Sequence, residues 1–528
     1  MNDYSFILSM RGIIHMNLSD QLSLTARENL AKTAYVFNGE ETNYQTLEGS
    51  VTKFASSLQE LGYQKGDHIA LVVGNTPHFI IGMYGALRLG LTVIPVNPIY
   101  TADEIAYILN NGDVKGVITL DVLMEKFEKM DKMFPNIEHY IVGETTPDYD
   151  VNQSSLSERS FSFTKLVHGG SLELERPMLH DDETAVILYT SGTTGKPKGA
   201  MLTHKNLYSN AKDVAEYLEI GANDRVIAAL PMFHVFCLTV ALNAPLVSGA
   251  TVLVVPKFSP EAVFQITKDF NATVFSGVPT MYNYLLQYPN EDEKDFSSIR
   301  LCISGGASMP VALLEKFEER FDVRVSEGYG LSEASPVTAF NPLDRPRKAG
   351  SIGTNIVNVE NKVVDENGNE LPPGEVGELI VRGPNVMKGY YKMPEETEAS
   401  IKDGWLYTGD MARIDEEGYF YIVDRKKDLI LVGGYNVYPR EVEEVLYSHG
   451  QISEVAVIGV PDPNLGEAVV AFVVSTDESV TEEELLELSK EKLAKYKVPS
   501  EIRFLDELPK NTTGKILRRS LKEQLATQ

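Results

Sequence analysis

The chain has 528 residues, and at roughly 100–200 residues per domain this length predicts about three to four packing units. Its 48 Lys and Arg residues stand against 75 Asp and Glu residues, which gives a formal net charge of −27. An electrostatic field of that sign repels phosphate backbones, so the charge argues against nucleic acid as a partner. An anionic substrate must therefore be neutralised by individually placed cations.

Cysteine usage and hydropathy bear on the compartment. The only two cysteines, Cys237 and Cys302, lie in apolar stretches, which predicts buried thiols in a reducing, cytoplasmic setting. Residues 1–15 carry Arg11 among short apolar runs and no small-residue cleavage site, so we interpret them as a loose extension, not a signal peptide. Residues 226–256 lack formal charge, but prolines and polar residues divide them into pieces too short to span a bilayer. We expect no integral membrane segment and leave open transient membrane contact and the choice between monomer and homodimer.

Short apolar strands alternate with helical segments through most of the chain. This alternation is typical of doubly wound parallel sheets with both faces covered, and so many strands require two such sheets. The expected strands are residues 68–73, 92–96, 116–120, 185–189, 226–230, 251–255, 273–275 and 301–303. The expected helices are residues 77–88, 101–111 and 235–247, and the second begins with the capping-box pair Thr101 and Glu104. The sequence therefore predicts an α/β fold.

The pattern changes after about residue 349. Residues 352–364 and 378–381 are expected to be antiparallel strands, because glycine- and proline-rich turns lie between them. This predicts a small β-rich subdomain at residues 349–424, within a large domain of residues 16–424. Beyond it, residues 425–528 are expected to form a mobile α+β domain. Its expected elements are helices at 439–447 and 481–493 and strands at 455–460 and 468–474.

The strongest local signal is the segment Tyr189-Thr190-Ser191-Gly192-Thr193-Thr194-Gly195-Lys196-Pro197-Lys198-Gly199. It follows an expected buried strand, and doubly wound sheets present ligands at the carboxyl ends of their strands. Glycines let the backbone approach a phosphate, hydroxyls donate hydrogen bonds, and the two lysines add positive charge. The Gly-x4-Gly-Lys spacing of the common nucleoside triphosphatase loop is absent, so this is a phosphate loop of another kind.

This loop resembles the signature of the adenylate-forming enzymes, which include acyl-CoA synthetases, peptide-synthetase adenylation domains and beetle luciferases. Further segments similar to that family's motifs follow in the family's order. They are Pro231-Met232-Phe233-His234, Gly328-Tyr329-Gly330-Leu331-Ser332-Glu333, Trp405-Leu406-Tyr407-Thr408-Gly409-Asp410, Asp424-Arg425-Lys426-Lys427-Asp428 and Pro509-Lys510-Asn511-Thr512-Thr513-Gly514-Lys515. The resemblance extends from about residue 25 to the end. It is nearest to bacterial long-chain fatty-acid–CoA ligases, with plant-type coumarate–CoA ligases close behind.

The resemblance implies that the chain binds ATP with Mg²⁺. Glu333 is then the expected metal ligand and Thr190 a second oxygen donor, because Mg²⁺ prefers hard oxygen ligands. Asp410 is expected to accept hydrogen bonds from the ribose hydroxyls, with Arg425 on the other side. Ser332 stands where the family usually has threonine, and its hydroxyl can still reach a phosphate. The residues expected to bind ATP or AMP are Thr190, Ser191, Gly192, Thr193, Thr194, Gly195, Lys196, Lys198, Gly305, Gly306, Glu327, Gly328, Tyr329, Gly330, Ser332, Asp410 and Arg425.

Lys515 is the expected catalytic cation, a point charge that bridges the substrate carboxylate and the α-phosphate. The resemblance further implies that the small domain rotates about a hinge at Lys427 once the acyl-adenylate has formed. That rotation would bring Gly433, Gly434 and Tyr435 to the thiol substrate, coenzyme A, because glycines leave room for its pantetheine arm.

The expected acyl pocket comprises His234, Val235, Phe236, Gly277, Val278 and Ser304. His234 resembles a gate near the adenylate and is counted as catalytic together with Lys515 and Glu333. Amino-acid-activating relatives place an acid after this position, whereas Val235 is neutral and the pocket stretches carry no formal charge. This favours an uncharged, fatty chain of open length. An aryl-acid–CoA ligase and a non-catalytic acyl- or nucleotide-binding homologue stay as alternatives.

Overall fold

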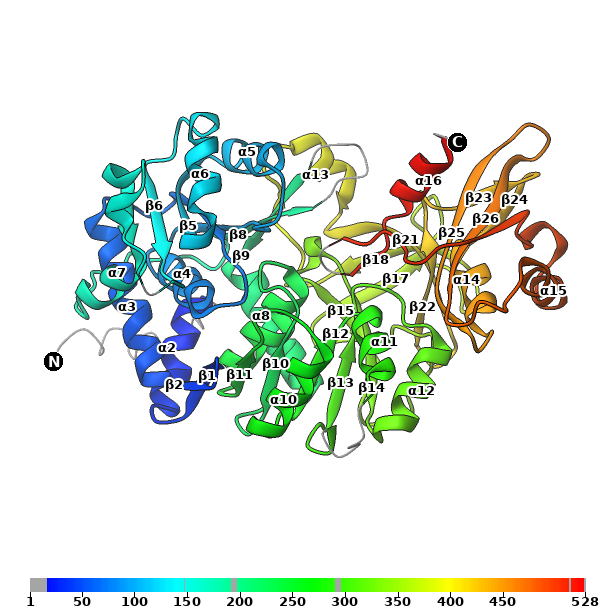
Figure 1. The fold of residues 1–528 in the computed structure, drawn as a ribbon, viewed down its shortest axis with the longest axis horizontal. Helices are drawn as coiled ribbons and strands as arrows, with labels where there is room; N and C mark the ends of the chain where they lie inside the picture. Colours follow the sequence, from blue (N-terminus) through cyan, green and yellow to red (C-terminus); the bar gives the residue numbers. More distant parts are fainter. Residues whose placement is uncertain (1–16, 147, 191–196, 290–295, 512–513, 527–528) are drawn as a thin grey trace. The chain divides into compact units, whose positions relative to one another are not determined.

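The computed structural model describes residues 17–146, 148–190, 197–289, 296–511 and 514–526 (Figure 1). The chain divides into two compact units. The first comprises residues 1–257, 332–336 and 384–399, and the second comprises residues 258–331, 337–383 and 400–528. The expected domain boundary between residues 424 and 425 falls inside the second unit and stays a prediction.

An eight-stranded sheet forms one layer of the first unit, in the order β19-β9-β8-β4-β3-β5-β6-β7. The strands from β8 to β7 run parallel, whereas β9 is antiparallel to both β8 and β19. Their bounds are His68–Val72 (β3), Thr92–Pro95 (β4), Val114–Leu120 (β5), His139–Gly143 (β6), Ser160–Ser162 (β7), Thr184–Thr190 (β8), Lys198–Thr203 (β9) and Gly389–Tyr390 (β19). Thr190, which begins the described flank of the predicted phosphate loop, is the carboxyl-terminal residue of the parallel strand β8.

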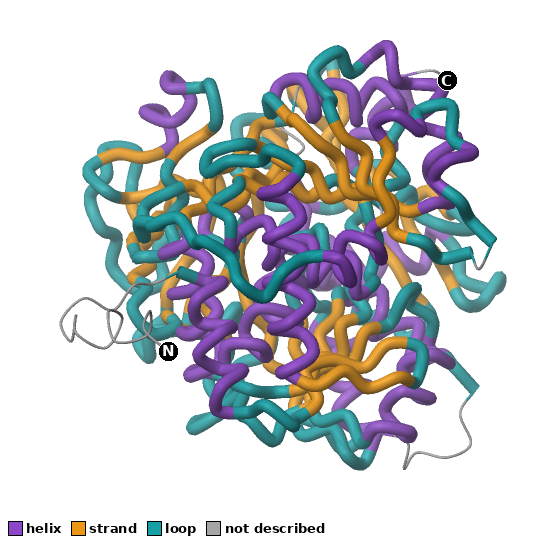
Figure 2. The backbone as a smooth tube through the Cα atoms, turned by 90° about the vertical axis from the view of Figure 1, so that its left-hand side faces the viewer, coloured by secondary structure: helices purple, strands orange, loops and turns teal. Residues whose placement is uncertain are grey.

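The first unit also contains the strands Thr33–Phe37 (β1), Glu40–Asn43 (β2), Arg225–Ala228 (β10) and Thr251–Val254 (β11), paired in the order β2-β1-β11-β10. Helices flank the strands, as the purple and orange segments of Figure 2 show. They are Leu18–Glu28 (α2), Tyr44–Glu60 (α3), Pro77–Arg88 (α4), Ala102–Asn111 (α5), Met124–Met130 (α6), Phe163–Gly169 (α7), His204–Tyr217 (α8) and Ala244–Val247 (α9). The predicted capping box of α5 is confirmed, because Thr101 accepts from the Glu104 amide and the Glu104 carboxylate accepts from the Thr101 amide.

One predicted helix of the first unit differs from expectation. Residues 235–247 were expected to form a regular helix, but Cys237–Asn243 is a π-helix that continues into α9. The amide of Ala244 donates to the carbonyl of Thr239, five residues earlier. Pro245 accounts for the wider turn, because proline lacks an amide hydrogen and its ring collides with the carbonyl four residues back in an α-helix.

The second unit begins with a run of strands in the order β12-β13-β14-β15-β16, of which the first three are parallel. Their bounds are Val274–Gly277 (β12), Leu301–Ser304 (β13), Val325–Gly330 (β14), Val337–Phe340 (β15) and Thr354–Asn355 (β16). The accompanying helices are Pro260–Phe270 (α10), Pro279–Gln287 (α11) and Val311–Phe321 (α12). The α/β class with parallel-rich sheets, predicted from the sequence, is confirmed in both units.

The β-rich part of the second unit is an antiparallel sheet of Glu360–Val364 (β17), Gly377–Arg382 (β18), Ile401–Lys402 (β20), Trp405–Ile414 (β21) and Phe420–Arg425 (β22). The strand expected at residues 352–364 was wrong in its extent. It is divided into β16 and β17, because Asn358 between them adopts a φ of 61° that no extended strand accommodates. A further helix, Pro394–Ser400 (α13), follows β19.

The C-terminal part of the second unit folds around a long antiparallel pair, Ile452–Asp462 (β25) and Gly466–Ser475 (β26). Side chains alternate along these strands, so one face packs Val457 and Val473 with Leu446 and Leu485, and the other packs Ile458 and Phe472 with Leu521. The remaining elements are Ile430–Val432 (β23), Tyr435–Val437 (β24), Glu501–Phe504 (β27), Pro439–Tyr447 (α14), Glu482–Lys492 (α15) and Arg518–Ala526 (α16). Among the described residues, no helix combines the length and the apolar character needed to cross a membrane.

Candidate active site

The predicted phosphate loop is framed by the β8–β9 hairpin. Thr190 is the cross-strand partner of Lys198, and the Thr190 hydroxyl donates to the Lys198 carbonyl at 3.4 Å. Both residues are half-buried, so their polar atoms are held close to the core but stay accessible. The predicted residues Ser191, Gly192, Thr193, Thr194, Gly195 and Lys196 lie outside the described part of the chain.

Glu333 lies in the short 3₁₀ turn Ser332–Ala334 and belongs to the same unit as the hairpin. The phenol of Tyr390 donates to Glu333 Oε1 at 2.8 Å, and the Met387 amide donates to the Glu333 carbonyl at 2.8 Å. Tyr390 is in β19, next to β9 of the hairpin, and the ammonium of Lys198 lies 5.2 Å from the centre of its ring. The structure therefore joins two predicted residues, Glu333 and Lys198, through a third that sequence reasoning missed.

These oxygens suit Mg²⁺. A carboxylate offers about four lone-pair sites, so a single bond from Tyr390 leaves Glu333 able to ligate a cation. Mg²⁺ is usually held by one or two carboxylates, waters and substrate phosphates instead of a cage made only of protein groups. In keeping with this, the described residues contain no cluster of three or more His, Cys, Asp or Glu side chains suited to a metal ion.

His234 lies in the loop between β10 and the π-helix. Its Nδ1 accepts from the Phe236 amide at 3.4 Å, an arrangement that caps the first helical turn and leaves the ring proton on Nε2. Val235 and Phe236 are buried, whereas His234 is half-buried. The imidazole therefore shapes the entry to the π-helix in addition to any contact with a substrate.

Asn75, which sequence reasoning also missed, anchors this loop through hydrogen bonds of its side chain. Its side-chain amide donates to the carbonyls of Ala228, Leu230 and Val255, at 3.2, 2.8 and 3.1 Å, and its Oδ1 accepts from the Met232 amide at 2.8 Å. A buried amide with this many partners fixes a loop firmly, because each lost bond would leave a buried polar group unsatisfied. Its partners are more than 150 residues away in sequence, so no local pattern indicates the role.

In the second unit, the glycine-rich ends of β12 and β13 lie together. The Gly305 amide donates to the Gly277 carbonyl at 3.3 Å, and the Ser304 side chain is buried. Gly306 has a φ of 77°, and a β-carbon built on it would lie 3.4 Å from a methyl group of Val278. The predicted pocket residues Gly277, Val278 and Ser304 are thus brought together, as are the predicted nucleotide residues Gly305 and Gly306.

The segment Glu327-Gly328 is packed tightly in β14. Glu327 is buried and Oε1 accepts from the Met309 amide at 3.0 Å, while Oε2 has no hydrogen-bond partner among the described residues. Burial raises the pKa of this carboxyl to about 7. A β-carbon on Gly328 would lie 2.0 Å from the Phe340 ring, so no other residue fits there without movement of the sheet.

Tyr329, Asp410 and Arg425 form a polar cluster next to Gly330, the last residue of β14. The Tyr329 phenol donates to Asp410 Oδ2, and Arg425 Nε lies 3.5 Å from Asp410 Oδ1. Asp410 and Arg425 are cross-strand partners in β21 and β22, which explains their proximity despite their separation along the chain. Burial, followed by the Asp410 carboxylate, raises the pKa of the Tyr329 hydroxyl, so the phenol stays a donor.

Lys515 lies beside this cluster. Gly514 packs so closely on the start of α11 that a β-carbon would lie 2.5 Å from Thr280 Oγ1 and 3.2 Å from Val278 Cγ2. The Lys515 amide donates to Asn511 Oδ1 at 2.9 Å, which closes the loop. Burial, followed by the positive charge of Arg425, lowers the pKa of Lys515 to about 8, and the Asp410 carboxylate partly opposes this.

The remaining predicted residues of the second unit are Lys427, whose charge acts on Lys515, and the segment of Gly433, Gly434 and Tyr435. Lys427 is in the turn after β22, where the Asp428 amide donates to the Arg425 carbonyl at 3.0 Å. Gly433 and Gly434 form the β23–β24 turn with φ values of 58° and 86°, and they are exposed. Tyr435 is exposed and stacks on Tyr496 with ring centres 4.7 Å apart. The described contacts of this hairpin do not connect it to Lys515.

Two protein-family models match the chain. The model for AMP-binding enzymes covers residues 22–391, and the model for the C-terminal domain of AMP-binding enzymes covers residues 441–515. The family expected from six sequence motifs is therefore confirmed.

Individual relatives agree over nearly the whole length. A long-chain-fatty-acid–CoA ligase of Bacillus subtilis (strain 168) is 41% identical over 514 residues, which cover 93% of this chain and 92% of that protein. A feruloyl-CoA synthase of Amycolatopsis sp is 34% identical over 497 residues, which cover 93% of this chain and 96% of that protein. Among solved structures, the anthranilate CoA ligase AuaEII in complex with anthranoyl-AMP matches with a TM-score of 0.90 at 27% identity, over 98% of this chain and 99% of that chain. The chain belongs to the AMP-binding enzyme family and is an adenylate-forming acid–CoA ligase.

Proposed function

We propose that the substrate acid is a long-chain fatty acid, activated with ATP to an acyl-adenylate and pyrophosphate and then transferred to coenzyme A. The observation that carries the choice of acid is the apolar, uncharged character of the segment that follows His234 and forms one wall of the proposed acyl pocket. Val235, Phe236 and the entire π-helix Cys237–Asn243 are buried, and none of these residues is charged. A buried charge would be needed to pair with the ammonium of an amino acid, whereas an alkyl chain needs only apolar surface. The name of the Bacillus relative supports the same choice.

The first half-reaction joins two anions. A carboxylate oxygen of the acid bonds to the α-phosphorus of ATP while the bond from that phosphorus to the bridging oxygen breaks, and pyrophosphate leaves. Lys515, protonated below its pKa of about 8, supplies the positive charge between the two reacting anions. Asp410, oriented by Tyr329 and Arg425, binds the ribose hydroxyls and thereby fixes the α-phosphate.

Glu333 and Thr190 are the groups that would hold Mg²⁺ in the first unit. Bound there, the ion neutralises the charge that develops on the departing pyrophosphate. Lys198 adds a fixed positive charge to the same hairpin, and the half-buried position of these side chains keeps their polar atoms accessible to a phosphate.

The second half-reaction needs a different arrangement. The sulfur of coenzyme A bonds to the acyl carbonyl carbon, the bond from that carbon to the AMP oxygen breaks, and the thiol proton passes to solvent. Gly433, Gly434 and Tyr435 are exposed on the C-terminal segment and available to form part of the thiol path. A rotation about Lys427 would exchange this hairpin for Lys515.

Both cysteines are buried free thiols, which supports a reducing, cytoplasmic location.

A panel of acids tests the proposal, with AMP release measured in the presence and absence of coenzyme A. Palmitate should support release that depends on coenzyme A, and a short chain such as butyrate should do so more weakly. An aryl acid is the second candidate, because the feruloyl-CoA synthase and the anthranilate CoA ligase are also similar to this chain. If kcat/KM is higher for coumarate or anthranilate than for palmitate, the substrate is an aryl acid and the fatty-acid proposal is wrong. No release with any acid would contradict the catalytic function itself.

A further inference from the structure

Tyr390 has an unusual set of partners for a residue in a two-residue strand. Its phenol donates to Glu333 Oε1 at 2.8 Å, and its ring faces the ammonium of Lys198, 5.2 Å from the ring centre. Glu333 and Lys198 come from segments that are far apart in sequence, one in a 3₁₀ turn and one at the start of β9. A single side chain therefore contacts both the Glu333 carboxylate and the Lys198 ammonium.

The backbone of Tyr390 is fixed as firmly as its side chain. Tyr390 pairs with Ala200 of β9, and its amide donates to Thr397 Oγ1 at 2.8 Å. The Thr397 hydroxyl in turn donates to the Met393 carbonyl at 2.8 Å. Because β19 is bonded to β9, the Tyr390 backbone is held in register with the strand that begins at Lys198.

We propose that Tyr390 is a positioning residue for the metal–phosphate half of the site. Its hydroxyl orients the Glu333 carboxylate toward Mg²⁺, and its ring holds the Lys198 ammonium toward the phosphates of ATP. This inference rests on the proposed roles of Glu333 and Lys198 and extends them to a residue that does not itself touch the substrate. Partners that orient a metal ligand commonly contribute to metal affinity without contacting the metal.

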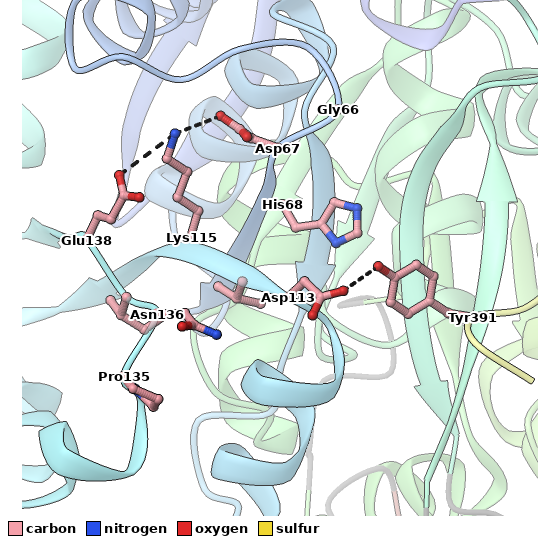
Figure 3. A pocket seen from close by; sticks show the side chains of 11 residues that line it. Gly66, Asp67, His68, Asp113, Lys115, Pro135, Asn136, Glu138 and Tyr391 are labelled. Carbon is pink, nitrogen blue, oxygen red and sulfur yellow. Dashed lines mark hydrogen bonds and ion pairs between the residues drawn. The ribbon is translucent and has the colours of Figure 1, made fainter.

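Tyr391 provides a matched control. Tyr391 follows β19 directly, and its phenol donates to Asp113 at 2.7 Å, in a polar pocket that Glu333 does not line. Figure 3 shows the Tyr391 phenol joined to the Asp113 carboxylate in that pocket. Tyr390→Phe and Tyr391→Phe thus each remove one phenol–carboxylate hydrogen bond from neighbouring residues, and only the first touches the proposed metal ligand.

The test is the binding of Mn²⁺ to the full chain in the presence of ATP, followed by electron paramagnetic resonance. Tyr390→Phe should weaken Mn²⁺ binding about tenfold, whereas Tyr391→Phe should leave it within about twofold. Tyr390→Leu should in addition weaken ATP binding measured without metal, because Lys198 loses its ring. Thermal unfolding of each variant reports whether it is folded.

A double-substitution cycle separates this role from a purely structural one. In a Glu333→Gln background, Tyr390→Phe should cause no further loss of Mn²⁺ affinity, because the group it orients is already impaired. Equal effects of Tyr390→Phe and Tyr391→Phe, or an undiminished effect in the Glu333→Gln background, would overturn the proposal. Unchanged Mn²⁺ binding in Glu333→Gln alone would remove Glu333 from the metal site and this inference with it. The proposed fatty-acid ligase function is judged separately, by AMP release with palmitate.

Discussion

The two compact units hold their candidate functional side chains in different ways. In the first unit, Tyr390 contacts both Glu333 and Lys198, and β19 pairs with β9. In the second unit, Lys515 lies among charges, and its pKa depends on burial, Arg425 and Asp410. In the first unit, packing and strand pairing therefore fix the positions of the functional side chains. In the second unit, burial and the neighbouring charges set the protonation of Lys515. The pH dependence of the reaction should therefore originate in the second unit.

Removal of the Lys515 charge should have the largest effect. Lys515→Ala should lower carboxylate-dependent exchange of pyrophosphate into ATP by about 10³-fold, because the cation between two reacting anions is lost. Thioester formation from supplied acyl-adenylate should be largely retained, since we propose that Lys515 acts only in the first half-reaction. Equal losses in the two assays would show that the lysine supports the fold and not one chemical step.

Asp410→Ala should have the next largest effect. It removes the proposed acceptor for the ribose hydroxyls and leaves the Tyr329 phenol without its carboxylate partner. Two hydrogen bonds to a charged acceptor are together worth about 3 kcal/mol, so KM for ATP should rise roughly 10²-fold. Mn²⁺ affinity of the ATP complex should change much less than KM, and a parallel loss of both would erase the distinction between the two units.

The pH dependence of adenylation sharpens the comparison. The pKa of Lys515 is lowered to about 8, so the required protonated form is present below pH 8 and is lost as pH rises through that value. Thus kcat/KM for pyrophosphate exchange should fall about tenfold per pH unit above pH 8. Lys515→Arg, if active, should shift this limb to higher pH, because a guanidinium stays charged throughout. An unshifted limb would assign the titration to another group.

Lys427→Pro should have the smallest effect of the series. Lys427 is the third residue of the turn closed by the Asp428 amide and the Arg425 carbonyl, and proline is disfavoured there. A misfit proline costs about 1 kcal/mol, so thioester formation should slow roughly fivefold while pyrophosphate exchange changes less. A larger effect on exchange than on thioester formation would argue against a hinge at this residue.

Local signals in the sequence located many of the elements correctly. Helices α4 and α14 begin with a proline in the first turn, and both were predicted at their observed bounds, Pro77–Arg88 and Pro439–Tyr447. The capping box of α5 was equally legible, because its two members are three residues apart. These features are determined by residues that are close together in the sequence, so they can be predicted from the sequence alone.

The residues that sequence reasoning missed depend on distant partners. Tyr390 bonds to Glu333 across 57 positions, and Asn75 bonds to Leu230 across 155 positions. Asp410 was predicted from its motif, but its phenol partner 81 positions earlier was assigned only to the nucleotide. Side-chain packing between separate sheets, loops and turns creates these contacts, and such packing cannot be read from local composition. The π-helix was missed for a related reason, since hydropathy does not distinguish a four-residue from a five-residue hydrogen-bond interval.

The π-helix also has a consequence for the diversity of such pockets. Each residue advances an α-helix by about 100°, so the removal of one residue from the π-helical interval would restore α-geometry and rotate the preceding wall by about that angle. A single insertion or deletion between Cys237 and Asn243 would thus present a different set of side chains to the acyl chain, while β10 and β11 kept their places. Substrate range can then change through chain length in one helix, without substitution of a single lining residue.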